Sequence, residues 1–577
     1  MRSVLLTSTM KYSLFLATLL SGGLLHADVK LPSVFSDHLV LQRDKPVAVW
    51  GTADAGEAVT VTFGGQSKQA TAGPDGSWKV ALDALKASAE PAELKVKGKN
   101  EVVFKDILVG EVWVCSGQSN MEWTVDKAVN PEQEIPAANH PKIRFFSVPK
   151  AVANEPLKDI AQRPSWQVCS PDSVKSFSAV GYFFGRELNK ALDVPVGLIN
   201  TSWGGTRAEA WTSKPALEAV PTCAAIITAW DDFLKTYNLE KAKADYETAT
   251  KVAKEKIEKI KAENAKPGAT PQPVPGAPRP FENLQTTQHR PAVLFNGMVA
   301  PIVPYTVKGA IWYQGESNQQ RAVQYQTLMP TLIADWRKQW GDELSFYIVQ
   351  LAGFGNGRTW PQPVGAADTW AELQWAQLQT ALRVKKSGLA VANDIGEEKD
   401  IHPRNKQEVG RRLALQALVK DYKKKDYQPN GISGGPIFGG ASVTGNKIVV
   451  SWSNVGGGLA ARDGGELKGF IIAGEDKVWK PAKARVVGKQ IHVSSEEVKN
   501  PVAVRYAWTA WCPEATLINK EGFPASLFRS DKWELSTEGV DSPFAAPKPA
   551  APAPAPAATP AVKPAEKEAP KALPKPA

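Results

Sequence analysis

The chain is poor in residues that form disulfides or bind metals, with four cysteines and six histidines among 577 residues. The cysteines are Cys115, Cys169, Cys223 and Cys512. They form neither a Cys-x-x-Cys pair nor a Cys/His spacing typical of zinc, so we expect no metal site. Four cysteines allow three complete disulfide pairings, and buried free thiols are an equal alternative.

The chain also lacks a long apolar segment beyond its first 27 residues and a concentrated patch of one charge. No later apolar run is long enough to span a bilayer, so we expect no transmembrane segment after signal removal. The formal charge is 69 − 59 = +10, but no basic motif is interleaved with aromatic residues. This pattern argues against nucleic acid as a partner.

The N-terminus has the features of a secretory signal. Arg2 and Lys11 are basic, residues 12–25 are largely apolar, and Leu25-His26-Ala27 resembles a cleavage site before Asp28. A membrane anchor is the alternative, but the apolar run is short for a spanning helix. We therefore predict a signal peptide at residues 1–27 and an exported protein, either periplasmic or extracellular.

The chain is too long for one hydrophobic core, so several domains are expected. Residues 28–105 alternate apolar and polar residues between Gly, Asp and Pro turns, which predicts a β-sandwich. Residues 431–540 return to strand patterns and predict a C-terminal β domain. Residues 541–577 are mainly Ala, Pro and Lys, a composition that predicts a disordered tail.

Residues 106–430 contain five apolar runs that each end in polar residues. The runs end before Ser116–Asn120, Thr201–Thr206, Gln314–Asn318, Gln350 and Asp394. Apolar strands separated by helices predict an α/β fold with a parallel sheet covered on both faces. The polar clusters would then gather at the carboxyl edge of the sheet, where such folds bind ligands.

A helical insertion is predicted at about residues 230–290 of this domain. Leu239, Tyr246 and Ile257 belong to a stripe with helical spacing over residues 230–265, and a proline-rich segment follows it. A surface excursion and a functional lid both fit this pattern.

A hydrolytic serine needs a base, and His402 alone among the histidines follows one of the five clusters. His26 lies in the signal, and the remaining four lie in predicted β regions or in loops (His38, His140, His289 and His492). A helix is predicted from Gln407 onward, so the loop before it can present His402 to a serine of the first cluster. Asp400, two residues earlier, could fix the imidazole tautomer, with Asp394 as a more distant acid.

Serine hydrolysis also needs donors that face the developing oxyanion. The Ser119 backbone N–H is one candidate, Gly204 or Gly205 offers a second, and the side-chain amide of Gln314 or Asn318 offers a third. A thiol mechanism through Cys115 is a poorer alternative, because that residue lies inside the strand, where burial is expected.

Four separated motifs resemble the sialate O-acetylesterase branch of the SGNH hydrolases. They are GQSNM, GGT…EAW, YQGESN and DIHPRNKQEVGRRLA, and the resemblance covers roughly residues 28 to 540. It implies a flavodoxin-like three-layer α/β/α domain with flanking β-sandwich regions, and a serine esterase that removes O-acetyl groups from sugars without a cofactor.

Site residues follow from this resemblance motif by motif. Ser119 matches the nucleophile, His402 the base, and Gly205 or Gly204 the glycine of the second motif. The third motif departs from the superfamily pattern because Asn318 is displaced by one position, so Gln314 competes with it as oxyanion donor. Many relatives have aspartate three residues before the histidine, where this chain has Lys399; Asp400 is the preferred acid, and a Ser-His dyad is the alternative.

The substrate is expected to be an O-acetylated glycan, with O-acetylated sialic acids first. Arg207 could pair with a sialic acid carboxylate, and Gln118 and Glu316 are assigned as further substrate-binding residues. Acetylated xylan is an alternative substrate, and a non-catalytic carbohydrate-binding protein is an alternative of another class. Three tryptophans could stack on sugars, although tryptophans beside a core more often pack within it; they are Trp203, Trp211 and Trp312.

Overall fold

The structure is a computed structural model that describes residues 28–160, 162–355 and 367–545. The predicted signal peptide and residues 546–577 of the predicted tail lie outside these ranges. Within them, no helix has both the length and the apolar character needed to cross a membrane.

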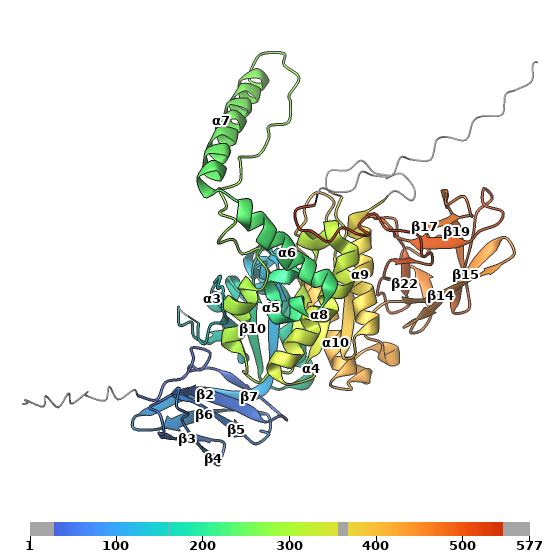
Figure 1. Cartoon of the computed structure of the whole chain (residues 1–577). Coiled ribbons are helices and arrows are strands. Elements are labelled where there is room, and N and C mark those ends of the chain that lie inside the picture. The colour runs from blue at the N-terminus through green and yellow to red at the C-terminus, as the bar shows by residue number, and fades with distance from the viewer. Residues whose placement is uncertain (1–27, 161, 356–366, 546–577) are drawn as a thin grey trace, which may run out of the picture.

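The centre of the molecule is a mostly parallel sheet (Figure 1). Its seven strands follow the order β13-β12-β11-β7-β10-β8-β9. In that order they are Ser387–Val391, Ser345–Gln350, Gly309–Tyr313, Glu101–Gly117, Val196–Ser202, His140–Ser147 and Gln167–Cys169. All neighbours pair in parallel except β8 and β9. The five predicted strands therefore share one carboxyl edge, and the α/β prediction is confirmed. Strand β8 was missed, because the proline and asparagine beside His140 suggested a loop.

Helices cover both faces of this sheet. Trp113 of β7 packs edge-on against Phe184 of α4 (Ala179–Leu192), which lies beside α10 (Lys406–Lys420). Trp312 of β11 packs edge-on against Trp336 of α8 (Ala322–Trp340), which lies beside α9 (Thr369–Arg383). In the pairing of β7 with β11, residues 113 and 312 point to opposite faces of the sheet, so the domain has three layers.

The N-terminal strands form a β-sandwich that is joined to the central sheet through β7. Its strands are β1 (Val40–Gln42), β2 (Val47–Thr52), β3 (Ala58–Phe63), β4 (Gln66–Thr71), β5 (Ser77–Leu82) and β6 (Ser88–Lys97). The first half of β7 pairs with β6 and β1, and its second half pairs with β10 and β11. This 17-residue strand runs across the boundary expected between residues 105 and 106.

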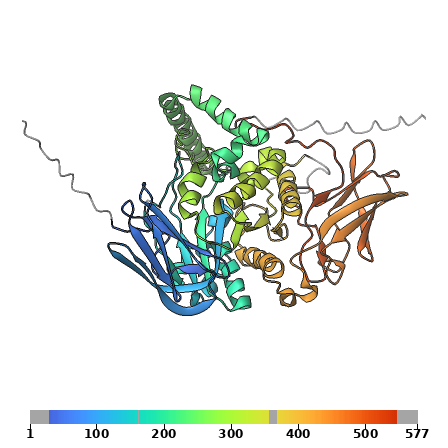
Figure 2. The same ribbon diagram turned by 60° about the horizontal axis from the view of Figure 1, so that its bottom comes forward.

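A C-terminal β region lies on the other side of the central domain from the sandwich (Figure 2). It holds two four-stranded antiparallel sheets, β14-β15-β20-β19 and β18-β17-β21-β23, and a small pair, β16-β22. In chain order the strands β14 to β23 are Ile437–Thr444, Lys447–Ser453, Leu459–Ala461, Phe470–Ala473, Trp479–Pro481, Lys483–Val487, Gln490–Ser494, Ala503–Tyr506, Leu517–Asn519 and Phe528–Arg529. Ile448 and Ile491 of one sheet share a core with Ile472 and Val504 of the other.

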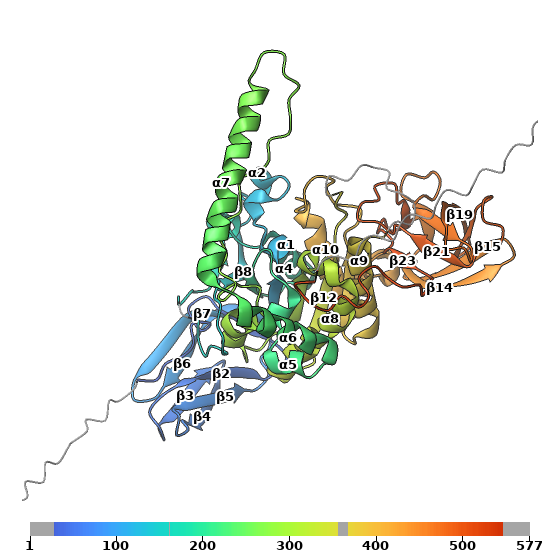
Figure 3. The ribbon, with the colours of Figure 1, turned by 45° about the horizontal axis from the view of Figure 1, so that its top comes forward.

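Two helices, not one, occupy the predicted insertion. Helix α6 (Pro221–Thr236) packs on α8, and α7 (Leu239–Asn264) projects away from the rest of the molecule (Figures 1 and 3). The helical conformation is interrupted between them, because the Asn238 side chain accepts the Lys241 N–H and starts a new helix. The remaining short helices are α1 (Ser119–Glu122), α2 (Pro131–Glu134), α3 (Pro171–Lys175) and α5 (Lys214–Glu218).

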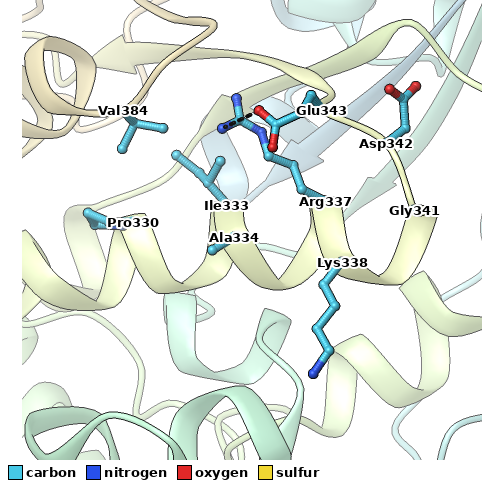
Figure 4. A pocket seen from close by; sticks show the side chains of 9 residues that line it. All are labelled: Pro330, Ile333, Ala334, Arg337, Lys338, Gly341, Asp342, Glu343 and Val384. Carbon is cyan, nitrogen blue, oxygen red and sulfur yellow. Dashed lines mark ion pairs between the residues drawn. The ribbon is translucent and has the colours of Figure 1, made fainter.

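One cavity of the described residues lies away from the polar clusters. It measures about 520 Å³ and is lined by the end of α8, by Asp342 and Glu343, and by Val384 (Figure 4). Arg337 and Glu343 form an ion pair of 3.8 Å across it. These residues precede β12 and β13, so the cavity lies at the amino edge of the sheet, opposite the edge that carries Ser119.

Candidate active site

The end of β7 forms a tight turn that presents Ser119 at the start of α1. Gly117 has φ +139°, and a Cβ added there would lie 2.2 Å from the Tyr313 carbonyl oxygen, so only glycine fits. The Gln118 N–H donates to that same carbonyl at 3.0 Å. Because Ser119 is the first residue of α1, its N–H has no acceptor within the helix. The turn thus exposes both the Ser119 hydroxyl and its N–H at the carboxyl edge.

His402 lies beside this serine. Its Nε2 is 2.8 Å from Ser119 Oγ, although 283 positions separate the two residues in the sequence. The Trp123 ring stacks on the imidazole, with centroids 5.0 Å apart and planes at 13°. Asn405 caps α10 and thereby ends the loop that carries His402. The imidazole is therefore held within proton-transfer distance of the hydroxyl.

Asp400 is the carboxylate beside the imidazole. Its Oδ1 accepts the His402 backbone N–H at 2.8 Å and lies 3.5 Å from His402 Nδ1. Asp394, the more distant candidate, forms a two-pronged ion pair with Arg412 at 2.6 and 2.8 Å. That pairing leaves Asp400 as the candidate partner of His402.

The surroundings of His402 favour its neutral form. Partial burial lowers the pKa of His402, and the Lys406 charge lowers it further, whereas Asp400 acts in the opposite direction. The net shift of the pKa is downward, so the imidazole is unprotonated at neutral pH and can accept a proton.

Gly204 and Gly205 lie close to Ser119 but differ in their backbone hydrogen bonds. The Gly204 N–H donates to Glu122 Oε2 at 2.6 Å, and Glu122 is held in turn by Lys150 at 2.5 Å. The Gly205 N–H, with φ +74° at that residue, makes no hydrogen bond to any part of the chain that the structure describes. Of the two glycines, Gly205 is the one with an N–H left for a ligand.

The two candidate amides lie in a buried network. Gln314 Nε2 donates to Asn318 Oδ1 at 2.6 Å and to Thr206 O at 3.2 Å, which uses both of its hydrogens. Asn318 Nδ2 donates one hydrogen to Glu209 Oε2 at 2.8 Å. This bonding contradicts the expected donor role of Gln314, since a side chain pointing into the core supports Asn318 instead. Asn318 is the amide that keeps a hydrogen.

Gln118 and Glu316 are also buried, contrary to their expected role as substrate contacts. Gln118 Oε1 accepts the N–H groups of Gly315 and Ser317, each at 3.3 Å. Glu316 Oε1 accepts from Asn120 Nδ2 at 2.6 Å, and the residue is only 6% exposed. Both residues tie neighbouring strand ends together, because a turn at the end of a strand directs some side chains inward.

Arg207 stands apart from these internal bonds. It is half-buried, and no carboxylate of the described residues lies within ion-pair distance of its guanidinium. Burial lowers its pKa, while Glu209 and Glu282 act against that shift. His289, 3.4 Å from Glu282, borders the neighbouring Gly205, since a Cβ there would lie 3.9 Å from His289 Cε1. The end of the insertion and Arg207 therefore flank the glycine turn.

Other candidates belong to the core. Trp211 and Trp312 are fully buried and pack edge to face with centroids 6.4 Å apart, so they cannot stack on a sugar. Trp203 is half-buried, with the Lys150 ammonium 5.5 Å from its ring. Cys115 is fully buried inside the sheet and burial raises the pKa of its thiol, which argues against it as a nucleophile. All four cysteines are free thiols.

Three residues beside the serine and histidine were not anticipated, namely Trp123, Glu122 and Lys406. Trp123 and Glu122 directly follow the GQSNM motif, and this position was the available signal. Lys406 lies within the motif DIHPRNKQEVGRRLA, but nothing in that motif shows that this lysine is buried.

The chain is similar to known carbohydrate esterases. A model of the carbohydrate esterase family described as sialic acid-specific acetylesterase matches residues 109–251 and 289–419. Sialate O-acetylesterases of mouse and human are 29% and 27% identical to the chain. Each alignment covers 84% of this chain, with 90% of the mouse and 88% of the human protein. The crystal structure of a carbohydrate acetylesterase from Xanthomonas citri has 34% identity and a TM-score of 0.72, covering 88% of this chain and all of that one.

Proposed function

The chain belongs to the sialic acid-specific acetylesterase family of carbohydrate esterases, and we propose that it removes O-acetyl groups from sugars through a serine nucleophile. That it is a carbohydrate esterase follows from the family and argues against a purely binding function. The serine mechanism rests on one observation above all, the 2.8 Å contact between Ser119 Oγ and His402 Nε2.

In the proposed reaction, His402 takes the proton of Ser119 as its oxygen attacks the acetyl carbonyl. The N–H groups of Ser119 and Gly205, with the Asn318 amide, stabilise the oxyanion. Asp400 stabilises the imidazolium, which then protonates the sugar oxygen as its bond to the acetyl carbon breaks, so that the sugar leaves with a free hydroxyl. Water hydrolyses the acetyl-enzyme by the same steps in reverse order, releasing acetate, and no cofactor takes part.

Replacing the nucleophile tests this mechanism. Ser119→Ala should lower acetate release from p-nitrophenyl acetate by about a thousandfold or more, because no covalent intermediate can form. Ser116→Ala is the matched control. Its hydroxyl donates to Thr201 O at 2.6 Å inside the sheet, so stability changes but the nucleophile remains. Full activity of folded Ser119→Ala protein would refute the assignment.

We propose O-acetylated sialic acids as the preferred substrates. The related mammalian enzymes named sialate O-acetylesterases support this choice. The half-buried Arg207 supports it too, since a guanidinium without an internal ion pair suits the carboxylate of an acidic sugar. Acetylated xylan or another neutral polysaccharide is the second candidate, because the related Xanthomonas citri protein is described only as a carbohydrate acetylesterase.

A comparison of substrates separates the two candidates. Acetate release should be faster from O-acetylated sialic acids than from acetylated xylan oligosaccharides. Arg207→Gln should raise KM for the sialic acid substrate about tenfold or more, and leave hydrolysis of p-nitrophenyl acetate unchanged. A strong preference for xylan that Arg207→Gln does not change would overturn the choice of sialic acids and support neutral glycans as the substrates.

We also propose that the protein is exported to the periplasm or beyond. The basic and apolar pattern of residues 1–27 supports export. N-terminal sequencing of the mature protein should then begin at Asp28.

A further inference from the structure

Asn120 connects the segment that carries Ser119 to the loop that carries His402. Its Nδ2 donates to Ile401 O at 3.0 Å and to Glu316 Oε1 at 2.6 Å, and its Oδ1 accepts from Lys406 Nζ. Asn120 follows Ser119 directly, and Ile401 precedes His402 directly. One buried amide therefore fixes the nucleophile relative to the base, and its own orientation depends on Glu316 and Lys406.

Lys406 is an unusual partner for this amide because it is fully buried. No carboxylate of the described residues lies within 4.0 Å of its Nζ, so its charge is balanced only at a distance. Its ammonium lies 5.2 Å from the Tyr313 ring centroid and 5.8 Å from that of Trp123. The Trp123 indole stacks on His402. Lys406 is therefore connected to the base by two routes, through Asn120 and through this ring.

Glu316 is the complementary group. Its Oε1 is bound by Asn120, but its buried Oε2 has no hydrogen-bond partner among the residues that the structure describes. A buried carboxylate oxygen without a donor is costly if the group is charged and acceptable if it is protonated. The Glu316 carboxyl and the Lys406 amine therefore have two states, a charged pair and a neutral pair.

Burial moves the pKa values of the two groups toward each other. Burial lowers the pKa of Lys406 to about 7, against the opposing effect of Glu316, Glu397 and Asp400. Burial likewise raises the pKa of Glu316, while Asn120 and Lys406 act to lower it. The titratable groups facing the pair are Tyr313 from β11, Tyr325 from α8, and Glu397, Asp400 and His402 from the loop before α10.

We propose that Lys406 and Glu316 form a titratable positioning pair that acts through Asn120 and Trp123 to align His402 with Ser119 and to set the proton affinity of His402. Neither residue touches the substrate in this arrangement. The inference rests on the proposed serine mechanism, because it assigns the pair no function apart from His402.

The test measures kcat and the pH profile of kcat/KM for p-nitrophenyl acetate. Lys406 lowers the pKa of His402. Lys406→Met should therefore move the acid limb of the kcat/KM profile to higher pH, by about half a pH unit or more. It should also lower kcat about tenfold or more through misalignment. Glu316→Gln keeps an oxygen for Asn120 but removes the charge that favours protonated Lys406, so it should move the acid limb in the same direction with a smaller loss of kcat.

Lys420→Met is the matched control on the same helix. Lys420 has an exposed side chain, but its Nζ donates to Ser387 O at 2.8 Å at the amino edge of the sheet, and desolvation of the ammonium there lowers its pKa to about 8. Its removal should affect stability and leave the acid limb in place. If Lys406→Met fails to fold, Glu316→Gln decides: a shifted limb supports the pair and an unchanged limb overturns it. An unchanged limb in folded Lys406→Met also overturns it, whereas activity in Ser119→Ala would refute the serine mechanism itself.

Discussion

Two adjacent glycines at the carboxyl edge of the sheet differ in the hydrogen bonding of their backbone N–H groups. The Gly204 N–H is taken by Glu122, while the N–H of Gly205 remains for a ligand. Since Glu122 belongs to the same short helix as Ser119, the glycine turn and the nucleophile are fixed relative to each other. The proposed oxyanion site would therefore be set by backbone geometry and one carboxylate, before any substrate binds.

Asp400 carries a prediction for pH dependence. Asp400 raises the pKa of His402, so Asp400→Asn should move the acid limb of kcat/KM to lower pH. It should also reduce kcat by about tenfold to a thousandfold, because the imidazolium loses its partner. The profile of hydrolysis between pH 4 and 8 measures both effects, the range being chosen around the ordinary histidine pKa of about 6.5.

Asp394→Asn is the control for this prediction. It should weaken the ion pair with Arg412 and reduce stability, but leave the acid limb unchanged. An unaltered profile and rate in Asp400→Asn would instead support a Ser-His dyad.

The meeting of Ser119 and His402 could be predicted from sequence, because both follow apolar strands whose carboxyl ends share one edge. The choice between Gln314 and Asn318 could not, since it depends on which side chains the turn after β11 directs into the core. The burial of Lys406 could not be predicted from the sequence either. A lysine at the start of a helix is ordinarily exposed, and the burial of this one depends on how the first turn of α10 packs in the folded protein.

At the scale of elements, helix α7 is separable from the rest of the molecule. It has no buried residue, and its contacts stay within the excursion: Tyr246 bonds Arg279 O at 3.0 Å, and Asn264 exchanges hydrogen bonds with Gln272. The match to the family model is likewise interrupted between residues 251 and 289. The sequence predicted a helix here but not its break at Asn238, because one capping side chain decides that break.

Excising this excursion is therefore expected to be tolerated. Replacing residues 240–280 by a short Gly/Ser linker should change the free energy of unfolding by less than about 1 kcal/mol, since no core contact is lost. Urea denaturation and p-nitrophenyl acetate hydrolysis measure the two consequences. Loss of activity in a stably folded variant would show that α7 acts as a lid.

At the scale of the whole molecule, the C-terminal β region is fastened to the central domain by a buried carboxylate. Glu372 of α9 is 2% exposed and accepts hydrogen bonds from the backbone and hydroxyl groups of both Ser536 and Thr537, at 2.6 to 3.1 Å. Four donors on one buried carboxylate make a strong and specific joint. The sequence pattern predicted strands in this region but could not show a joint, because its two halves are 164 positions apart.

Removing the carboxylate should weaken that joint. Glu372→Ala leaves four donors unpaired and should lower the free energy of unfolding by about 2 to 5 kcal/mol. Glu497→Ala is the control, because its ion pair with Lys480 is largely exposed and should contribute under about 1 kcal/mol. Equal unfolding curves for the two variants would contradict the role given to Glu372.

Strand β7 has a consequence for how such a molecule can be altered. Its first residues belong to the N-terminal sandwich, and its last residues lead to Ser119. The sandwich therefore cannot be exchanged as a separate domain. A fusion boundary placed between residues 105 and 106 would cut β7, which is also a central strand of the parallel sheet. Tension applied to the N-terminal sandwich would likewise be transmitted along this continuous, hydrogen-bonded strand toward Ser119, because no flexible linker separates the two.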